Sequence, residues 1–145
     1  MDTQLSKYFN LSEMTRSTQA SEKGIDNTAS PEIVYNLKLL TTNVLDPIRE
    51  RLGVPVYITS GYRCPALNSL VGGVSNSQHV KGQAADIHTD NMSTEQLYQW
   101  VKQSGIPYDQ LIQEFDSWVH VSFADNPRKM ALRITTDGTA PDQTA

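Results

Sequence analysis

The sequence has little that would mark a disulfide-bonded or nucleic-acid-binding protein. Its 145 residues contain a single cysteine, Cys64, which excludes an intrachain disulfide and a cysteine-based structural zinc site. No run of lysine or arginine is present, and the net charge of -4 is the wrong sign for a phosphate backbone. We therefore expect no nucleic acid partner, and any metal site must use histidine and carboxylate ligands.

Long apolar segments are also missing. Residues 1–8 have neither the basic stretch nor the apolar core of a secretory signal, and no apolar run approaches the length of a membrane span. The sequence predicts a chain made in the cytoplasm without a signal peptide and without a membrane partner. A substrate at the cell wall or in the periplasm would then require a separate route of delivery.

The length and composition are typical of one globular domain. With 38% hydrophobic and 19% charged residues, a chain of this size can bury a core without a second module. We expect a domain over residues 1–136, a flexible C-terminal tail over residues 137–145, and a monomer. Composition alone indicates no function.

Alternating helix and strand signals predict an α+β fold. Residues 31–52 begin with Pro31, follow Ser30 as a helix cap and carry apolar residues at intervals of three and four, which predicts a long helix. Residues 17–30 are polar and are expected to form a loop. The other predicted helices and strands are helices 64–70 and 93–102 and strands 54–59, 83–88, 111–115, 118–123 and 131–135. This order suits helices packed on a small antiparallel sheet.

The segments 77–86 and 118–120 are the most informative for chemistry. The first reads Ser-Gln-His-Val-Lys-Gly-Gln-Ala-Ala-Asp, and the second reads Trp-Val-His. A catalytic zinc ion usually takes three nitrogen or oxygen ligands and keeps a fourth position open. His79, Asp86 and His120 would supply that set to one Zn²⁺ ion, because the glycine and alanines between the first two ligands let the chain turn tightly.

Taken singly, these histidines favour a simpler interpretation. A lone histidine on a strand is more often a hydrogen-bonded core residue than a metal ligand. His120 by itself favours that interpretation, and His88 is expected to be a supporting or surface residue. An α+β domain with incidental histidines therefore stays open at this level.

The complete pattern Ser-x-His-x-x-Gly-x-Ala-x-Asp, followed by Trp-Val-His, resembles peptidase family M15, the zinc D-Ala-D-Ala carboxypeptidase family. The likeness includes Ser-Gly-Tyr-Arg at 60–63 and is closest to the compact single-domain branch common in bacteriophages and prophages. It implies a Hedgehog/DD-peptidase-like fold and Zn²⁺ held by His79, Asp86 and His120. It also implies hydrolysis of peptidoglycan stem-peptide amides at the bacterial cell wall, as by a phage or prophage lysin.

A zinc peptidase also needs a general base, and the chain offers Glu114 and Asp116. Many relatives place this acid three residues before the last histidine, where this chain has Ser117. If the strands are joined by a two-residue loop, Glu114 faces away from His120. If the loop has three residues, Glu114 lies diagonally from His120 on the same face. We favour Glu114.

Further residues are expected around the metal. Arg63 follows a strand end and a glycine, and the resemblance suggests that it stabilises the substrate carbonyl oxygen as charge develops there. A surface salt bridge is the alternative for this arginine. Ser77, Gln78, Tyr62 and Trp118 are expected to line the cleft and contact substrate, although Ser77 also suits support of a ligand and the aromatic residues also suit a core.

The sequence leaves the bond and the activity open. A D-Ala-D-Ala carboxypeptidase should offer a cation to the terminal carboxylate, whereas an L-Ala-D-Glu endopeptidase needs an open-ended cleft. The alternative to an enzyme is a zinc-binding structural or cell-wall-binding protein, such as a phage particle component. Such a protein would keep the metal ligands but tolerate loss of Glu114 and Arg63.

Overall fold

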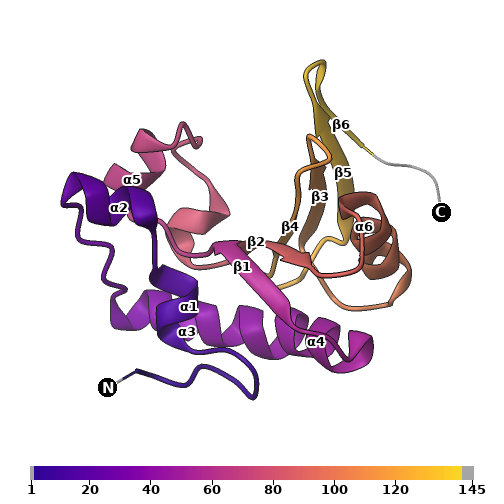
Figure 1. Cartoon of the computed structure of the whole chain (residues 1–145), viewed down its shortest axis with the longest axis horizontal. Coiled ribbons are helices and arrows are strands. Elements are labelled where there is room, and N and C mark those ends of the chain that lie inside the picture. The colour runs from indigo at the N-terminus through magenta and orange to yellow at the C-terminus, as the bar shows by residue number, and fades with distance from the viewer. Residues whose placement is uncertain (1, 142–145) are drawn as a thin grey trace.

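A computed structural model of the chain describes residues 2–141 and shows, over that range, a six-stranded sheet flanked by helices (Figure 1). The strands are β1 (Val56–Ser60), β2 (Ala84–Thr89), β3 (Gln110–Glu114), β4 (Trp118–Ser122), β5 (Met130–Thr135) and β6 (Gly138–Pro141). Their order is β1-β2-β4-β3-β5-β6, and all neighbours are antiparallel except β3 and β5. The expected α+β class is confirmed.

The helices are mostly short. They are α1 (Leu11–Thr15), α2 (Thr18–Lys23), α3 (Pro31–Leu40), α4 (Asp46–Leu52), α5 (Pro65–Leu70) and α6 (Thr94–Gln103), with a π-helical turn η1 (Thr41–Leu45) and a 3-10 turn η2 (Gln78–Lys81). The loop expected over residues 17–30 is wrong in part, because α2 lies within it. Ser17 caps this helix by accepting a hydrogen bond from Ala20 N, and Ala20 is its buried residue. A helix with one buried alanine leaves no apolar period in the sequence.

The expected long helix is present as α3, η1 and α4 in one continuous rod (Figure 1). Pro47 has no N–H and its ring crowds the preceding turn. The rod widens to a π-helical turn just before it, where Asp46 N donates to Thr41 O. The apolar stripe thus continues along the rod to Ile48, which is fully buried.

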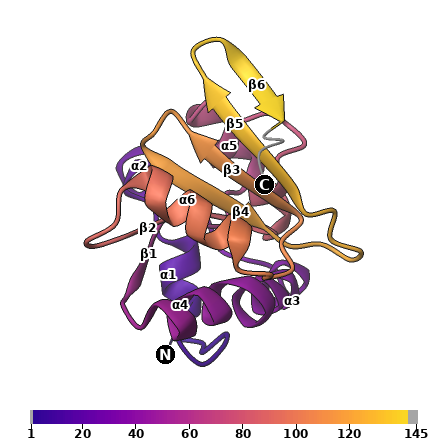
Figure 2. The same ribbon diagram turned by 90° about the vertical axis from the view of Figure 1, so that its right-hand side faces the viewer.

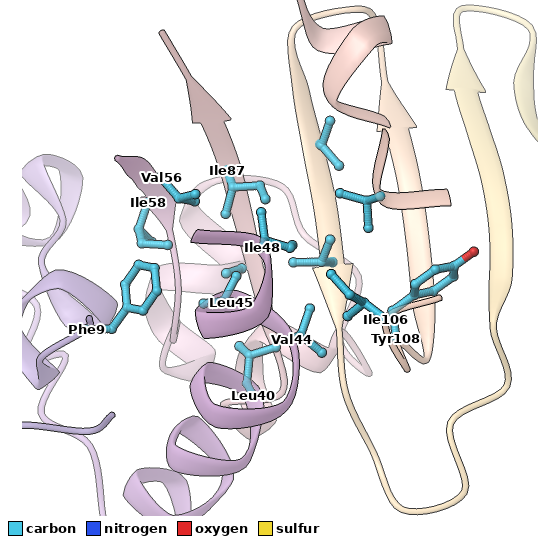
Figure 3. Packing of buried hydrophobic residues seen from close by; sticks show 14 of the residues in the cluster. Phe9, Leu40, Val44, Leu45, Ile48, Val56, Ile58, Ile87, Ile106 and Tyr108 are labelled. Carbon is cyan, nitrogen blue, oxygen red and sulfur yellow. The ribbon is translucent and has the colours of Figure 1, made fainter. Parts of the chain in front are cut away.

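The core lies between this rod and one face of the sheet. Figure 3 shows Leu45 and Ile48 of the rod near Ile58 of β1 and Ile87 of β2, and all four belong to one buried cluster. Helix α6 contacts β3 and β4 and lies across them (Figure 2). No helix within the described part of the chain is long and apolar enough to cross a membrane.

The C-terminal tail expected from residue 137 is a strand over part of its length. The turn Thr136-Asp137 reverses the chain, and β6 then pairs with β5, with Thr139 opposite Ile134. The four residues of β6 are exposed and mostly small or polar, so no buried face marks them as a strand. Residues 142–145 of the expected tail lie outside the described residues.

Strand register brings the chemically informative residues to the sheet face opposite the apolar positions of β2 and β4. Asp86 of β2 pairs with His120 of β4, and His120 pairs with Ile112 of β3. Directly opposed residues share a face, so these three form a row across the sheet. Glu114 is opposite Trp118 in the same β3–β4 pair and therefore lies two positions along from this row.

Candidate metal centre and cleft

His79 reaches the sheet from η2. The Ser77 hydroxyl caps this turn by accepting a hydrogen bond from His79 N at 3.1 Å. On the imidazole, Nδ1 lies 2.6 Å from Gly61 O, and a carbonyl oxygen can only accept, so Nδ1 carries the proton. This leaves the Nε2 lone pair free to bind a metal, 3.3 Å from Asp86 Oδ1.

Asp86 and His120 complete a compact donor set. His120 Nδ1 lies 3.0 Å from Asp86 Oδ1, and one ligand atom from each of His79, Asp86 and His120 lies within 4.8 Å of the others. All three residues are buried. Ligand atoms of one tetrahedral zinc ion are separated by roughly 3.3 to 3.5 Å, since each bond is about 2.0 to 2.2 Å. Two imidazole nitrogens and one carboxylate oxygen at this spacing fit a zinc ion.

Asp86 is held in the charged form that a metal ligand requires. Burial alone would raise the pKa of its carboxyl group. Hydrogen bonds with His120 and His79, together with their positive charge when protonated, outweigh burial and hold the pKa well below its usual range. The carboxylate is therefore ionised at neutral pH.

Glu114 lies beside the predicted ligands, whereas Asp116 does not. The β3–β4 loop has three residues, 115–117, which is the register that places Glu114 and His120 on one face. Glu114 Oε1 is 3.8 Å from His120 Nδ1. Burial, followed by the negative charge of Asp86, raises the pKa of Glu114, which suits a proton-transfer group. Asp116 is exposed and accepts instead from Gln113 Nε2 at 3.2 Å.

The centre opens into a cavity of about 770 Å³. Its lining includes Arg63, Ser77, Gln78, Lys81, Ile112, Glu114, Trp118 and Arg128 together with the three predicted ligands. A second cavity of about 310 Å³ shares Arg63, Val71, Asp86 and Trp118 with the first, so the two adjoin at the metal centre. Tyr62 lines only this second cavity and is buried, so its predicted contact with substrate is confined to that side.

Three polar atoms of residues that line the larger cavity are buried without a hydrogen-bond partner among the described residues: Arg63 Nε, Gln78 Oε1 and Trp118 Nε1. Buried polar groups are normally hydrogen-bonded, so unpartnered atoms in a cavity wall are available to a bound ligand or to water. The Arg63 backbone N–H donates to His79 O at 3.1 Å, which ties this residue to η2. The structure thus brings Arg63, Gln78 and Glu114 to one cavity, as the sequence predicted.

Sequence reasoning missed Asp109 and Arg128. Asp109 precedes β3 and is 2% exposed, and it forms an ion pair of 2.7 Å with Arg128, which lines the larger cavity. The Arg128 hydrogen bond holds the pKa of Asp109 at about 2, against the opposing effect of burial. The available signal was an acid placed directly before the residues of β3.

Gly82 closes η2 with a φ of 72°, and a Cβ there would lie 2.9 Å from Ile33 Cγ2. We expect Gly82→Ala to be destabilised by about 1 to 2 kcal/mol from the left-handed backbone and by about 1 to 3 kcal/mol more from overpacking. Gly53→Ala is the matched control, because Gly53 has a φ of 71° but no atom within 4 Å of its Cβ position. Urea unfolding should give a lower free energy of unfolding for Gly82→Ala than for Gly53→Ala. An equal loss of stability in the two variants would contradict the close contact of Gly82 with Ile33.

Comparison with known proteins agrees with the geometry. A search of curated proteins found no match. The family model described as Peptidase M15 matches residues 7–122, which include η2, the β2–β4 strand pair and all the predicted metal ligands. The chain therefore belongs to peptidase family M15, a family of zinc-dependent metallopeptidases.

Proposed function

We propose that the protein is a zinc peptidase that hydrolyses amide bonds of peptidoglycan stem peptides at the bacterial cell wall, as a phage or prophage lysin would. The observation that carries this proposal is the placement of Glu114 beside His120, 3.8 Å from its Nδ1, in the cavity that also holds Arg63. A structural zinc site requires only its ligands. A partly buried acid with a raised pKa and a partly buried arginine add the groups that hydrolysis requires.

When bound by His79, Asp86 and His120, a zinc ion supplies Lewis-acid chemistry by polarising the substrate carbonyl and making water more acidic. Glu114 accepts the proton of the attacking water and returns it to the amine nitrogen as the C–N bond breaks. Arg63 offers a guanidinium N–H to the carbonyl oxygen while that oxygen carries negative charge. The raised pKa of Glu114 lies closer to neutral pH than the ordinary value for a glutamate. This favours a group that must first accept a proton from water and then donate it to the amine.

The shape of the cleft favours an internal bond over a terminal one. The two cavities adjoin at Arg63, Val71, Asp86 and Trp118, which line both of them. A peptide that occupies both cavities would pass the reacting centre, as the substrate of an L-Ala-D-Glu endopeptidase must. A carboxypeptidase would need only one of the two cavities for the remaining chain.

The test is incubation of the protein with defined muropeptides that carry complete pentapeptide stems, with zinc and after chelation, followed by mass spectrometry. We expect zinc-dependent hydrolysis of an internal bond, which frees a fragment of several residues from the C-terminal end of the stem. Release of a single terminal D-Ala would assign a carboxypeptidase instead. A zinc-loaded protein that cuts no muropeptide would favour the non-catalytic alternative, a zinc-binding structural or wall-binding protein.

A further inference from the structure

Asp109 joins two side chains that line the larger cavity. Its Oδ2 accepts from Gln78 Nε2 at 3.0 Å and from Arg128 Nη2 at 2.7 Å. Its Oδ1 accepts from Arg128 Nε at 2.9 Å and from the Arg128 backbone N–H at 3.0 Å. The carboxylate is itself held at the end of the β3–β4 strand pair, because Asp109 N donates to Ser122 O at 2.8 Å.

This contact fixes which end of the Gln78 amide faces the cavity. An ionised carboxylate accepts hydrogen bonds and donates none, so the NH₂ group of Gln78 must face Asp109. Its Oε1 is then turned away from Asp109, and that atom is buried without a partner among the described residues. Since Gln78 lines the cavity next to His79, the unpartnered oxygen is suited to accept an N–H of a bound peptide.

The same carboxylate orients Arg128. The Nε and Nη2 edge of its guanidinium is bound to Asp109, and 54% of its side chain is exposed. The remaining Nη1 group forms no hydrogen bond or ion pair with a residue between 2 and 141, and Arg128 lines the cavity. A guanidinium held in this way presents a cationic donor suited to a carboxylate.

We propose that Asp109 is a positioning residue that gives this side of the cleft one acceptor, Gln78 Oε1, for a peptide N–H and one cation, Arg128, for a carboxylate. The preferred ligand is a peptide segment that carries a free carboxylate beside its backbone amide. The inference rests on the proposed function only in taking the cavity as the peptide site.

An exchange of acid and amide tests the positioning. In Asp109→Asn, the new amide donates toward position 78, so Gln78 turns its oxygen to it and presents NH₂ to the cavity. We expect peptide affinity to fall about tenfold, the effect of losing about one hydrogen bond. In the double variant Asp109→Asn with Gln78→Glu, the new carboxylate accepts from the new amide and again offers an oxygen to the cavity. Affinity should then recover by at least about threefold over Asp109→Asn alone.

Binding is measured by calorimetry with a pentapeptide muropeptide and zinc-loaded protein in which Glu114→Gln prevents turnover. The readout is therefore independent of hydrolysis by the unmodified protein, which tests the proposed function separately. Side-chain amide signals of Gln78 in ¹⁵N NMR report its orientation directly. These signals should shift in Asp109→Asn, whether or not peptide is present.

Glu95→Gln is the matched control, because Glu95 forms a comparable two-bond pair with Arg133, at 2.7 and 2.9 Å, and neither residue lines either of the two cavities. Its peptide affinity should stay within about twofold of the parent. Unchanged binding in Asp109→Asn, or no recovery in the double variant, would overturn the inference. Absence of muropeptide binding by the parent would overturn it as well. If Asp109 had only a structural role, Asp109→Asn would lower stability, and adding Gln78→Glu would not restore peptide affinity.

Discussion

Glu114→Gln should lower kcat for muropeptide hydrolysis by about 10² to 10⁴, the usual contribution of a general acid–base group. Glutamine keeps the size of the side chain but cannot take the proton of the attacking water. The three predicted ligands are unchanged, so zinc content should remain one ion per chain. Steady-state kinetics together with metal analysis measures both quantities.

Asp116→Asn is the matched control for this substitution. Asp116 is exposed and bound to the Gln113 amide, and it is not among the residues that line the cavity. Its removal should leave kcat within about twofold of the unmodified protein. The reverse result, with activity lost in Asp116→Asn and kept in Glu114→Gln, would show that Asp116 transfers the proton.

The pH dependence of kcat/KM provides an independent measure of the same group. Glu114 must be ionised to accept a proton, and burial followed by Asp86 raises its pKa above the ordinary 4.5. Activity should therefore fall as pH decreases through that raised pKa, and the acid limb should lie above 4.5. In Glu114→Gln this limb should disappear, because glutamine does not titrate.

The sequence predicted those parts of the structure that local patterns determine. The apolar stripe of residues 31–52 predicted the rod, and period-two alternation predicted β3 and β4. The segments 77–86 and 118–120, through their resemblance to peptidase family M15, predicted the cluster of His79, Asp86 and His120. Two hairpin registers were possible, and the three-residue loop observed in the structure places Glu114 beside His120.

Contacts between distant side chains could not be predicted in this way. Gln78, Asp109 and Arg128 belong to three segments that meet only after the sheet has formed. No periodic pattern in the sequence indicates that these three side chains contact one another. The residues of β6 have no apolar face, so pairing with β5 rather than burial defines that strand. Helix α2 escaped prediction for a similar reason, since Ala20 alone is buried in it.

His120→Ala should abolish zinc binding while the protein stays folded. The substitution leaves His79 and Asp86 as the two remaining protein ligands. A catalytic zinc ion usually has three protein ligands, so it should bind to two of them much more weakly. Loss of a supporting contact alone costs about 10 to 100-fold in metal affinity, so loss of a ligand should cost at least about 100-fold. Competition with a chromophoric chelator and metal analysis of the purified protein measure this change.

His88→Ala is the matched control, because His88 lies on β2 only two residues beyond Asp86 but is exposed and stacks against Tyr57. It should bind one zinc ion with unchanged affinity. Thermal unfolding distinguishes the two variants, since a ligand that binds the native state at about 100 times its Kd adds about 2.7 kcal/mol to the free energy of unfolding. Zinc should raise Tm for the unmodified protein and for His88→Ala, but not for His120→Ala. An equal zinc effect in both variants would place the metal elsewhere and remove the basis for assigning Glu114 as the proton acceptor.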